Sequence, residues 1–295
     1  MQKSYSKDNA IRRSLSDFTL AKQLKLRLGK VLARIFSQRA EIVEKAPFSA
    51  EMSALDRLVR NGLQAQALEG KNYEPLRRYL SHYWGEEAKN FHDGWQDRFE
   101  RMFLNHDVIV IDELQKLLEL DPSSTGYDRL YEIGCGGGQV LDYLCKRLSD
   151  IEEFVGIDIG SAQIEANHDV YKGTDLSFHT ADAVEWIPTN AKPNSVFLTN
   201  GGVFEYFLRE ELVMLFKHIA ENCRPAAVAI VETIGSDHDL EGSSESFVYG
   251  RELSFSHNYP ALLREAGFKI AHQSERVGYE VDGGGRWIRL LATNG

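Results

Sequence analysis

Residues 131–138, Tyr131-Glu132-Ile133-Gly134-Cys135-Gly136-Gly137-Gly138, decide the fold of this chain. They stand where the apolar run Arg129–Ile133 gives way to a helical pattern that begins at Gly138. Glycines at such a turn let the backbone bend sharply and approach a ligand, and open α/β sheets bind ligands at the carboxyl ends of their strands. The stretch therefore predicts an α/β fold with a nucleotide-type loop.

Short apolar runs alternate with helical segments from residue 129 onward, which is typical of a parallel sheet with crossover helices. The predicted strands are Arg129–Ile133, Glu153–Asp158, Leu176–Thr180, Ser195–Asn200, Ala227–Thr233, Lys269–Glu275 and Trp287–Ala292. The predicted helices between them are Gly138–Leu148, Ala162–Tyr171, Arg209–Cys223 and Asn258–Ala266. The last two strands lack a long helical stretch between them, so we expect an antiparallel hairpin with its turn at residues 282–285. The fold class is α/β, a Rossmann-like seven-stranded sheet that is mostly parallel.

The N-terminal part of the chain has helical patterning only, so residues 1–105 are predicted to be an all-helical region and residues 106–295 the α/β domain. The first helix is predicted over Asp17–Glu44 and has a basic polar face. Its apolar residues recur at three- and four-residue spacing: Leu20, Leu24, Leu28, Val31, Leu32, Ile35 and Phe36. We expect this helix to pack its apolar face on its own domain, with an anionic membrane surface as the alternative.

Charge is distributed unevenly along the chain. The net charge is −10, yet residues 1–40 carry ten Lys or Arg against Asp8 and Asp17 alone. An acidic body disfavours nucleic acid as a partner, because phosphate neutralisation supplies most of the affinity in such complexes. The basic N-terminal helix can instead contact a partner protein or a membrane surface, and a homodimer stays open.

Compartment follows from what the sequence lacks. No apolar run approaches the roughly 20 residues that span a bilayer, and no apolar stretch follows the first basic residues as in a secretory signal. The three cysteines, Cys135, Cys145 and Cys223, have no paired metal-type spacing. Reduced thiols and a cytoplasmic location are therefore expected.

The spacing of the glycines separates two cofactor classes. A dinucleotide fingerprint needs glycine at the first, third and sixth positions, but the sixth position here is Gln139. A carboxylate at Glu132 would repel a pyrophosphate, whereas it suits the ammonium group of a methionine-like ligand. A cationic sulfonium cofactor is favoured over NAD, which remains the cofactor of the alternative function, an NAD-dependent oxidoreductase.

With these residues in view, the sequence resembles the class I S-adenosylmethionine-dependent methyltransferase family, whose first motif is an acidic residue followed by Gly-x-Gly-x-Gly. Here that motif is Glu132, Gly134, Gly136 and Gly138, with Cys135 inside the loop. The resemblance covers Asp107 to Gly295 and implies S-adenosyl-L-methionine as the cofactor.

The same resemblance assigns further cofactor residues. Asp158, followed by Ile159, ends the second strand where the family binds the ribose hydroxyls, and Asp182, followed by Ala183, stands where it binds the adenine amino group. Asn200 and Gly201 follow the fourth strand, where the family forms the floor near the transferred methyl group.

Methyl transfer to a hydroxyl, an amine or an acidic carbon also needs a group that takes up the proton of the acceptor. His257 is predicted as that base because it lies between the fifth-strand insertion, residues 235–256, and the next helix. Glu205 and Tyr206 are also candidate catalytic residues, and we expect only one of these neighbours to face the site. Direct transfer needs no metal, and none is predicted.

An aromatic segment in the N-terminal region is predicted to bind the acceptor, because such side chains combine apolar area with polar tips. Its candidate residues are Tyr79, His82, Tyr83 and Trp84. In the family that the sequence resembles, N-terminal helices often form a lid over a small-molecule acceptor. The predicted function is therefore methyl transfer to a small molecule at an undetermined O, N or C atom, and a catalytically silent, methyltransferase-like scaffold is a further alternative.

Overall fold

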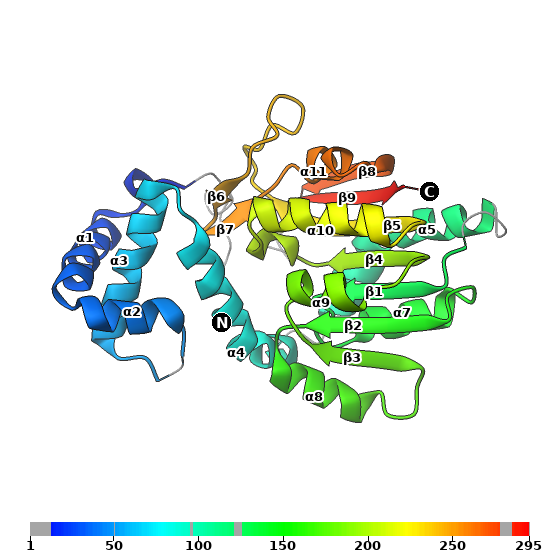
Figure 1. Ribbon diagram of the computed structural model, residues 1–295, viewed down its shortest axis with the longest axis horizontal. Helices are drawn as coiled ribbons and strands as arrows, with labels where there is room; N and C mark the ends of the chain where they lie inside the picture. The colour runs from blue at the N-terminus through cyan, green and yellow to red at the C-terminus, as the bar shows by residue number, and fades with distance from the viewer. Residues whose placement is uncertain (1–12, 50, 95–96, 121–125, 278–284, 295) are drawn as a thin grey trace.

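The computed structural model describes residues 13–49, 51–94, 97–120, 126–277 and 285–294 (Figure 1). Within these ranges no helix has both the length and the apolar composition needed to cross a membrane. Four N-terminal helices lie beside an α/β body, and α4 lies between the first three helices and the sheet (Figure 1).

A seven-stranded sheet in the order β3-β2-β1-β4-β5-β9-β8 forms the body. The strands are β1 (Arg129–Ile133), β2 (Glu153–Asp158), β3 (Leu176–Thr180), β4 (Ser195–Asn200), β5 (Ala226–Ile234), β8 (Lys269–Val277) and β9 (Arg286–Thr293). The pairings among β1 to β5 are parallel, and β9 is antiparallel to both β5 and β8. The predicted fold class is thus confirmed. The hairpin turn predicted at residues 282–285 lies mostly outside the described residues.

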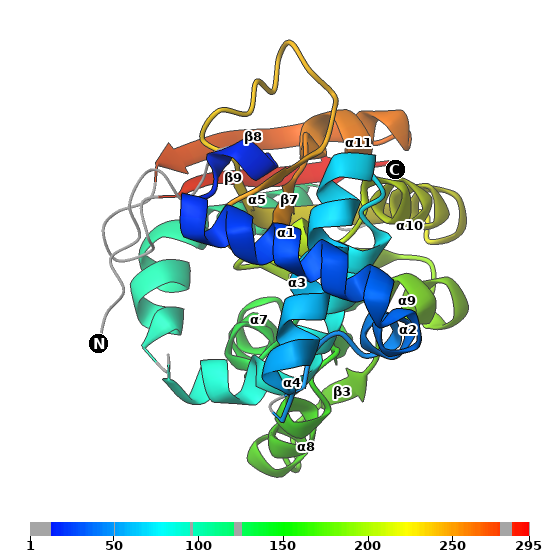
Figure 2. The same cartoon turned by 90° about the vertical axis from the view of Figure 1, so that its left-hand side faces the viewer.

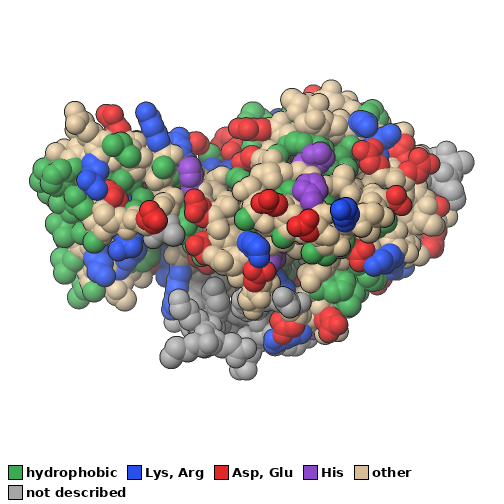
Figure 3. Space-filling view, turned by 90° about the horizontal axis from the view of Figure 1, so that it is seen from below, with side chains coloured by type: hydrophobic (Ala, Val, Ile, Leu, Met, Phe, Trp, Pro, Cys, Tyr) green, Lys and Arg blue, Asp and Glu red, His purple; other side chains and the backbone are tan. Residues whose placement is uncertain are grey.

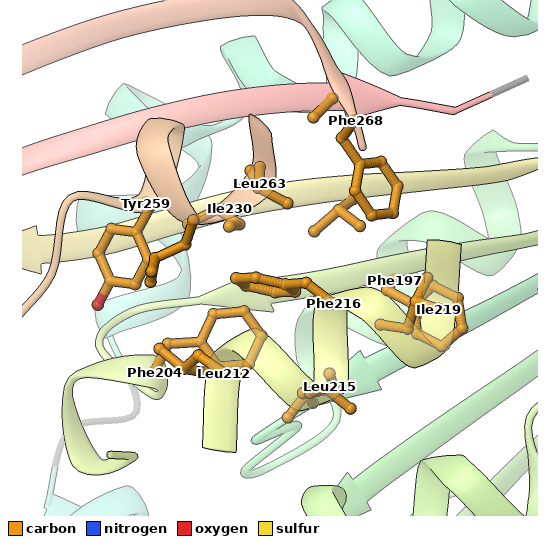
Figure 4. Packing of buried hydrophobic residues seen from close by; sticks show 14 of the residues in the cluster. Phe197, Phe204, Leu212, Leu215, Phe216, Ile219, Ile230, Tyr259, Leu263 and Phe268 are labelled. Carbon is orange, nitrogen blue, oxygen red and sulfur yellow. The ribbon is translucent and has the colours of Figure 1, made fainter. Parts of the chain in front are cut away.

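Helices cover both faces of the sheet. One layer contains α9 (Ala183–Asn190), α10 (Arg209–Asn222) and α11 (Tyr259–Glu265), and the other contains α5 (Ile109–Leu120), α7 (Gln139–Arg147) and α8 (Ser161–Val170). Side chains along β5 alternate between the two layers: Val228 and Ile230 pack in the first, whereas Ala227 and Ala229 pack in the second. Figure 4 shows Phe204, Phe216 and Tyr259 within the first layer.

Three helices form the outer N-terminal part: α1 (Leu20–Ile35), α2 (Ser37–Lys45) and α3 (Ala54–Gly70). A short 3₁₀ turn, η2 (Leu15–Asp17), precedes them. The prediction of one helix over Asp17–Glu44 was wrong at Phe36, where the backbone leaves the helical region (φ −104°, ψ 55°) and separates α1 from α2.

The prediction for the packing of α1 was also wrong. Helix α1 crosses α3 (Figure 2). Gly29 lies at this contact, since a Cβ atom there would collide with the backbone of Leu58 and Gly62. The buried residues of α1 are Leu26, Gly29 and Ala33. Because only a surface of small residues lets two backbones approach so closely, Leu20, Leu24 and Leu28 on the opposite side of α1 point away from the domain.

Other elements had no counterpart in the sequence-based prediction. The π-helix η3 (Phe99–Asp107) precedes α5, and α9 follows β3. The segment after β5 forms a two-stranded sheet, β6 (Phe247–Tyr249) with β7 (Ser254–Ser256), and the turn η4 (Phe204–Tyr206) follows β4. These elements, with α4 (Glu74–Gly94), surround the edge of the sheet that is expected to hold a ligand.

Candidate active site

A cavity of about 600 Å³ lies at the carboxyl ends of the parallel strands. One wall comes from the ends of β1, β2 and β4, and the opposite wall comes from α4, η3, η4 and the β6–β7 sheet. The predicted cofactor residues on its surface are Glu132, Gly134, Cys135, Asp158, Ile159, Asp182, Ala183, Asn200 and Gly201. These residues lie close together because parallel strands end at one edge of their sheet.

The glycine-rich loop turns as the sequence predicts. Gly134, Gly136 and Gly138 have φ angles of 70°, 48° and 74°, a region that side-chain-bearing residues rarely adopt. The backbone nitrogen of Gly134 donates to the carbonyl of Ile157 at 2.7 Å, which holds the loop against β2. Gly136 has a second constraint, because a Cβ atom there would collide with the imidazole of His92 from α4.

Glu132 is the group that best tests the fit of the predicted cofactor. Its side chain is buried, and its Oε2 atom has no hydrogen-bond partner among the residues that the structure describes. Burial and the nearby Asp158 raise the pKa of Glu132 well above its ordinary value. The ammonium group of a cationic ligand in the cavity would supply the missing donor, and the positive charge of the ligand would favour the ionised form. The residues present therefore fit an S-adenosylmethionine-type ligand.

Asp158 ends β2 and faces the same cavity. Its Oδ2 atom accepts from the Gly136 nitrogen at 3.0 Å, and its Oδ1 atom accepts from the Gly160 nitrogen at 2.8 Å. Burial raises the pKa of Asp158, and these backbone hydrogen bonds oppose that shift. Each carboxylate oxygen has a second lone pair, so the side chain can still accept from ligand hydroxyls.

Asp182 caps α9 by accepting from the backbone nitrogen of Val184 at 3.2 Å. Its other oxygen, Oδ2, accepts from Nη2 of Arg77 on α4 at 2.6 Å. Arg77 also donates through Nε to Glu211 at 2.9 Å, and its guanidinium lies 4.5 Å from the centre of the Phe207 ring. Asp182 therefore joins the α/β body to α4 in addition to lining the cavity.

Asn200 is the last residue of β4, and Gly201 follows it. The Oδ1 atom of Asn200 is buried and has no hydrogen-bond partner within the described part of the chain, so it can accept from a ligand donor. The carbonyl of Gly201 accepts from Nη2 of Arg98 at 2.7 Å. Arg98, which immediately precedes η3, thereby brings that helix to the floor of the cavity.

Both Glu205 and Tyr206 line the cavity, so the expectation that only one of them faces the site was wrong. The turn η4 is short and tightly wound, which lets neighbouring side chains reach the same cavity from different angles. Glu205 accepts from the Tyr249 hydroxyl at 2.6 Å, and the Tyr206 ring lies 5.3 Å from that of Trp84. Burial raises the pKa of Glu205.

His257 is not among the residues that line this cavity. It is fully buried, and its ring nitrogens contact the Ser246 hydroxyl at 2.7 Å and the Phe207 carbonyl at 3.0 Å. A general base must reach the proton that it removes, so the geometry argues against the predicted base role. Burial lowers the pKa of His257 to about 3, which is the state of a structural, neutral imidazole.

Only Trp84 of the four predicted acceptor residues lines the cavity. Tyr79 and Tyr83 instead pack against Phe48, with ring centres 6.1 and 5.0 Å away, and His82 is also absent from the cavity wall. The reason is the helical period: positions three or four residues from Trp84 share its face, and its immediate neighbours do not.

That period also identifies cavity residues that the sequence analysis missed. Starting from Trp84, the spacing leads along α4 to Arg77, Leu80, Ser81, Ala88, Phe91 and His92, all on the cavity wall. Burial and nearby Arg98 lower the pKa of His92 to about 4, so its imidazole is neutral near pH 7. Arg98, Tyr249 and Trp287 complete the wall from elements whose approach only the tertiary fold determines.

Part of the chain that forms this cavity matches a known protein family. Residues 130–226, which run from β1 to the start of β5, match the family model described as a methyltransferase domain. These residues form a methyltransferase domain. The match agrees with the predicted S-adenosylmethionine-dependent methyltransferase family and its cofactor, and the alternative NAD-dependent oxidoreductase is dropped.

Relatives of the methyltransferase domain are distant. The chain is 23% identical over 186 residues to a malonyl-[acyl-carrier protein] O-methyltransferase of Brevibacillus brevis, a match that covers 58% of this chain and 66% of the relative. It is 29% identical over 103 residues to a carboxy-S-adenosyl-L-methionine synthase of Nitratiruptor, covering 34% of this chain and 37% of that protein. The chain thus spans less than two thirds of either relative.

Among solved structures, the fold is similar to that of a SAM-dependent methyltransferase from Leishmania major, with a TM-score of 0.53 and 15% identity. The similarity covers 73% of this chain and 82% of that one. At this identity the likeness concerns the fold, and it agrees with the strand order described above.

Proposed function

We propose that this chain is an active S-adenosylmethionine-dependent methyltransferase that acts on a small-molecule acceptor. The observation that supports this most directly is the continuity of the cavity. One end is bounded by Glu132, Asp158 and Asn200, and the same space extends to Trp84 and Tyr206. A cofactor at the first end would present its methyl group to an acceptor at the second.

In this proposal the first end binds the cofactor, which supplies an electrophilic methyl group when bound. Glu132 receives the cationic methionine portion, Asp158 accepts from the ribose hydroxyls, and Asp182 with Ala183 borders the adenine. The buried orphan oxygen of Glu132 supports its assignment, because an unpaired buried carboxylate is costly and a cationic ligand relieves that cost.

The second end has the character of an acceptor pocket. Aromatic rings from α4, η3, η4 and β9 surround it: Trp84, Phe91, Phe99, Tyr206 and Trp287. Such walls hold a planar or apolar molecule and exclude water. We propose that α4 and η3 form the cover of this pocket.

The polar groups at the second end of the cavity can take up the proton that the acceptor loses on methylation. Glu205 and Tyr249 form a 2.6 Å hydrogen bond, and both line the cavity. We propose this pair in place of His257. The Tyr249 hydroxyl would take the proton of the acceptor and pass its own proton to the Glu205 carboxylate, to which it already donates.

Calorimetric titration with S-adenosylmethionine, S-adenosylhomocysteine and NAD in parallel tests the cofactor part of the proposal. We expect micromolar binding of the two adenosyl ligands and none of NAD. Binding of neither adenosyl ligand would sink the proposal and favour a catalytically silent scaffold. Acceptor screening then follows the conversion of S-adenosylmethionine to S-adenosylhomocysteine, with Glu205→Gln and Tyr249→Phe compared at saturating cofactor.

A further inference from the structure

Helices α1, α2 and α3 have no part in the cavity. Within the described ranges, the N-terminal residues that line it begin at Arg77 on α4. The first three helices lie on the far side of α4 from the sheet (Figure 1). The cavity is therefore bordered by α4 and η3, and the surface of α1–α3 is separate from it.

That surface carries an apolar stripe on α1 that faces solvent. The exposed fractions are 79% for Leu20, 65% for Leu24, 50% for Leu28, 51% for Val31 and 66% for Ile35. Successive members are three or four residues apart, so they form one continuous line on the helix. Phe36 and Ile42 are exposed beyond its end, at 43% and 67%. Large exposed apolar patches on a folded protein mark a surface that another molecule covers.

Cations flank the stripe on both sides. At 100° per residue, Arg27 and Arg34 fall on one edge of the stripe and Lys25 on the other, and all three are exposed. Helix α1 has no acidic residue, and the salt bridges found among the described residues include none of these three cations. Figure 3 shows green hydrophobic side chains gathered at the end of the molecule formed by these helices, with blue Lys and Arg side chains beside them.

We propose that α1 docks this protein on an anionic lipid bilayer as a peripheral, surface-lying helix. Its apolar stripe would enter the boundary between headgroups and acyl chains, while Lys25, Arg27 and Arg34 would lie level with the anionic headgroups. Helix α3 holds α1 from the opposite side through the contact of Gly29 with Gly62, so the stripe points outward from a rigid support.

The charge around the stripe favours an anionic bilayer over a second copy of the chain as the binding partner. A two-fold symmetric contact through the stripe would bring Arg27 and Arg34 of one copy close to cations of the other, and α1 has no acidic residue to pair with them. The chain as a whole carries −10, although residues 1–40 hold ten Lys or Arg against two Asp, so the negative charge lies in the rest of the chain. An anionic bilayer would therefore attract the α1 end of the protein and repel the rest, so the protein would bind with α1 facing the bilayer.

Flotation with vesicles tests this. The full chain is mixed with vesicles of phosphatidylcholine alone, or of phosphatidylcholine containing about one third phosphatidylserine. We expect flotation with the anionic vesicles only. The bound fraction should fall on raising salt from about 0.1 M to about 1 M, which shortens the screening length from about 10 Å to about 3 Å.

Two variants separate the apolar and the charged contributions. Leu24→Gln with Leu28→Gln removes part of the stripe, and we expect at least a tenfold loss of partition coefficient. Arg27→Gln with Arg34→Gln should lower it about 25-fold, roughly fivefold for each cation near an anionic surface. Glutamine is a good helix former, so both variants should melt at the wild-type temperature. Met214→Gln, at a 66% exposed residue on α10, is the matched control and should float like wild type.

Several results would overturn the proposal. These are no flotation of wild type with anionic vesicles, equal flotation with neutral ones, or stripe variants that float unchanged. Self-association of wild type that the Leu24→Gln, Leu28→Gln variant abolishes would assign the stripe to a second copy and overturn it equally. Cofactor affinity should be the same in all these variants, so failure here is distinguishable from failure of the proposed methyl transfer.

Discussion

The Oδ2 atom of Asp158 accepts a hydrogen bond from the backbone nitrogen of Gly136 at 3.0 Å, which joins the end of β2 to the middle of the glycine-rich loop. One carboxylate thus has two tasks, since it shapes the loop and also faces the cavity. Substitution of Asp158 is therefore expected to affect both stability and ligand binding.

Asp158→Asn should raise the dissociation constant for S-adenosylhomocysteine at least about tenfold, because a hydrogen bond to a charged group contributes about 1.5–3 kcal/mol. The melting temperature should fall by a few degrees, since the new amide cannot accept from both backbone nitrogens. Calorimetry and thermal melting measure the two effects. Asp169→Asn, at an exposed aspartate of α8, is the control, and an Asp158→Asn protein that binds like this control would refute the ribose assignment.

Arg77→Met should destabilise the protein by about 3–5 kcal/mol, because it leaves Asp182 and Glu211 without their buried cationic partner. The loss should be greatest where α4 meets the body, and faster proteolysis within α4 would show it.

Arg78→Met is the matched control for this prediction. Arg78 is adjacent in sequence but partly exposed, and its ion pair with Glu74 is 3.4 Å long. Such surface pairs contribute about 0–1 kcal/mol. Arg78 also donates to the Glu44 carbonyl at 3.1 Å, an exposed hydrogen bond that contributes about 0.5–1.5 kcal/mol, so this variant should lose less stability than Arg77→Met. Equal unfolding midpoints in urea for the two variants would show that the Arg77 cluster adds no stability.

Much of the α/β body could be predicted from local sequence. The buried strands β1, β2 and β4 are short apolar runs between turn residues, and β3 is a largely exposed edge strand. All four have the bounds that were expected. The glycine loop and the acidic residues after the strands were also predictable, because the topology of a parallel sheet brings them to one edge.

Other features depend on tertiary contacts that no local pattern encodes. The stripe on α1 has the ordinary periodicity of a core-facing helix, yet the contact between Gly29 and Gly62 turns the opposite side inward. His257 has the sequence position of a base, but the β6–β7 segment places it beneath the site against the Phe207 carbonyl. The face of α4 that lines the cavity depends on how Arg77 meets Asp182.

His257→Ala should lower the melting temperature while leaving affinity for S-adenosylhomocysteine unchanged. The substitution removes both hydrogen bonds of a fully buried imidazole, which costs about 1–3 kcal/mol for each partner left unpaired. His168→Ala, at an exposed histidine of α8, is the control. An unchanged melting temperature for His257→Ala, combined with loss of turnover, would restore the base role.

Glu232 should make stability depend on pH. This carboxyl on β5 is fully buried beside the backbone nitrogen of Val203, and burial raises its pKa from 4.5 to about 8. Between these two values the folded state keeps the proton, whereas the unfolded state releases it. Stability therefore falls as pH rises from about 4.5 to about 8, and this contribution is constant outside that window.

Glu232→Gln removes this titration while keeping an oxygen that can accept from Val203. Relative to wild type, the variant should gain stability as pH rises from 5.5 to 8, by as much as roughly 3 kcal/mol at 1.36 kcal/mol for each pH unit. Urea unfolding at several pH values measures the difference. Glu241→Gln, at an exposed residue, should run parallel to wild type throughout. Parallel curves for Glu232→Gln as well would mean that Glu232 is ionised in the folded protein, with its charge compensated by the Val203 nitrogen and its neighbours.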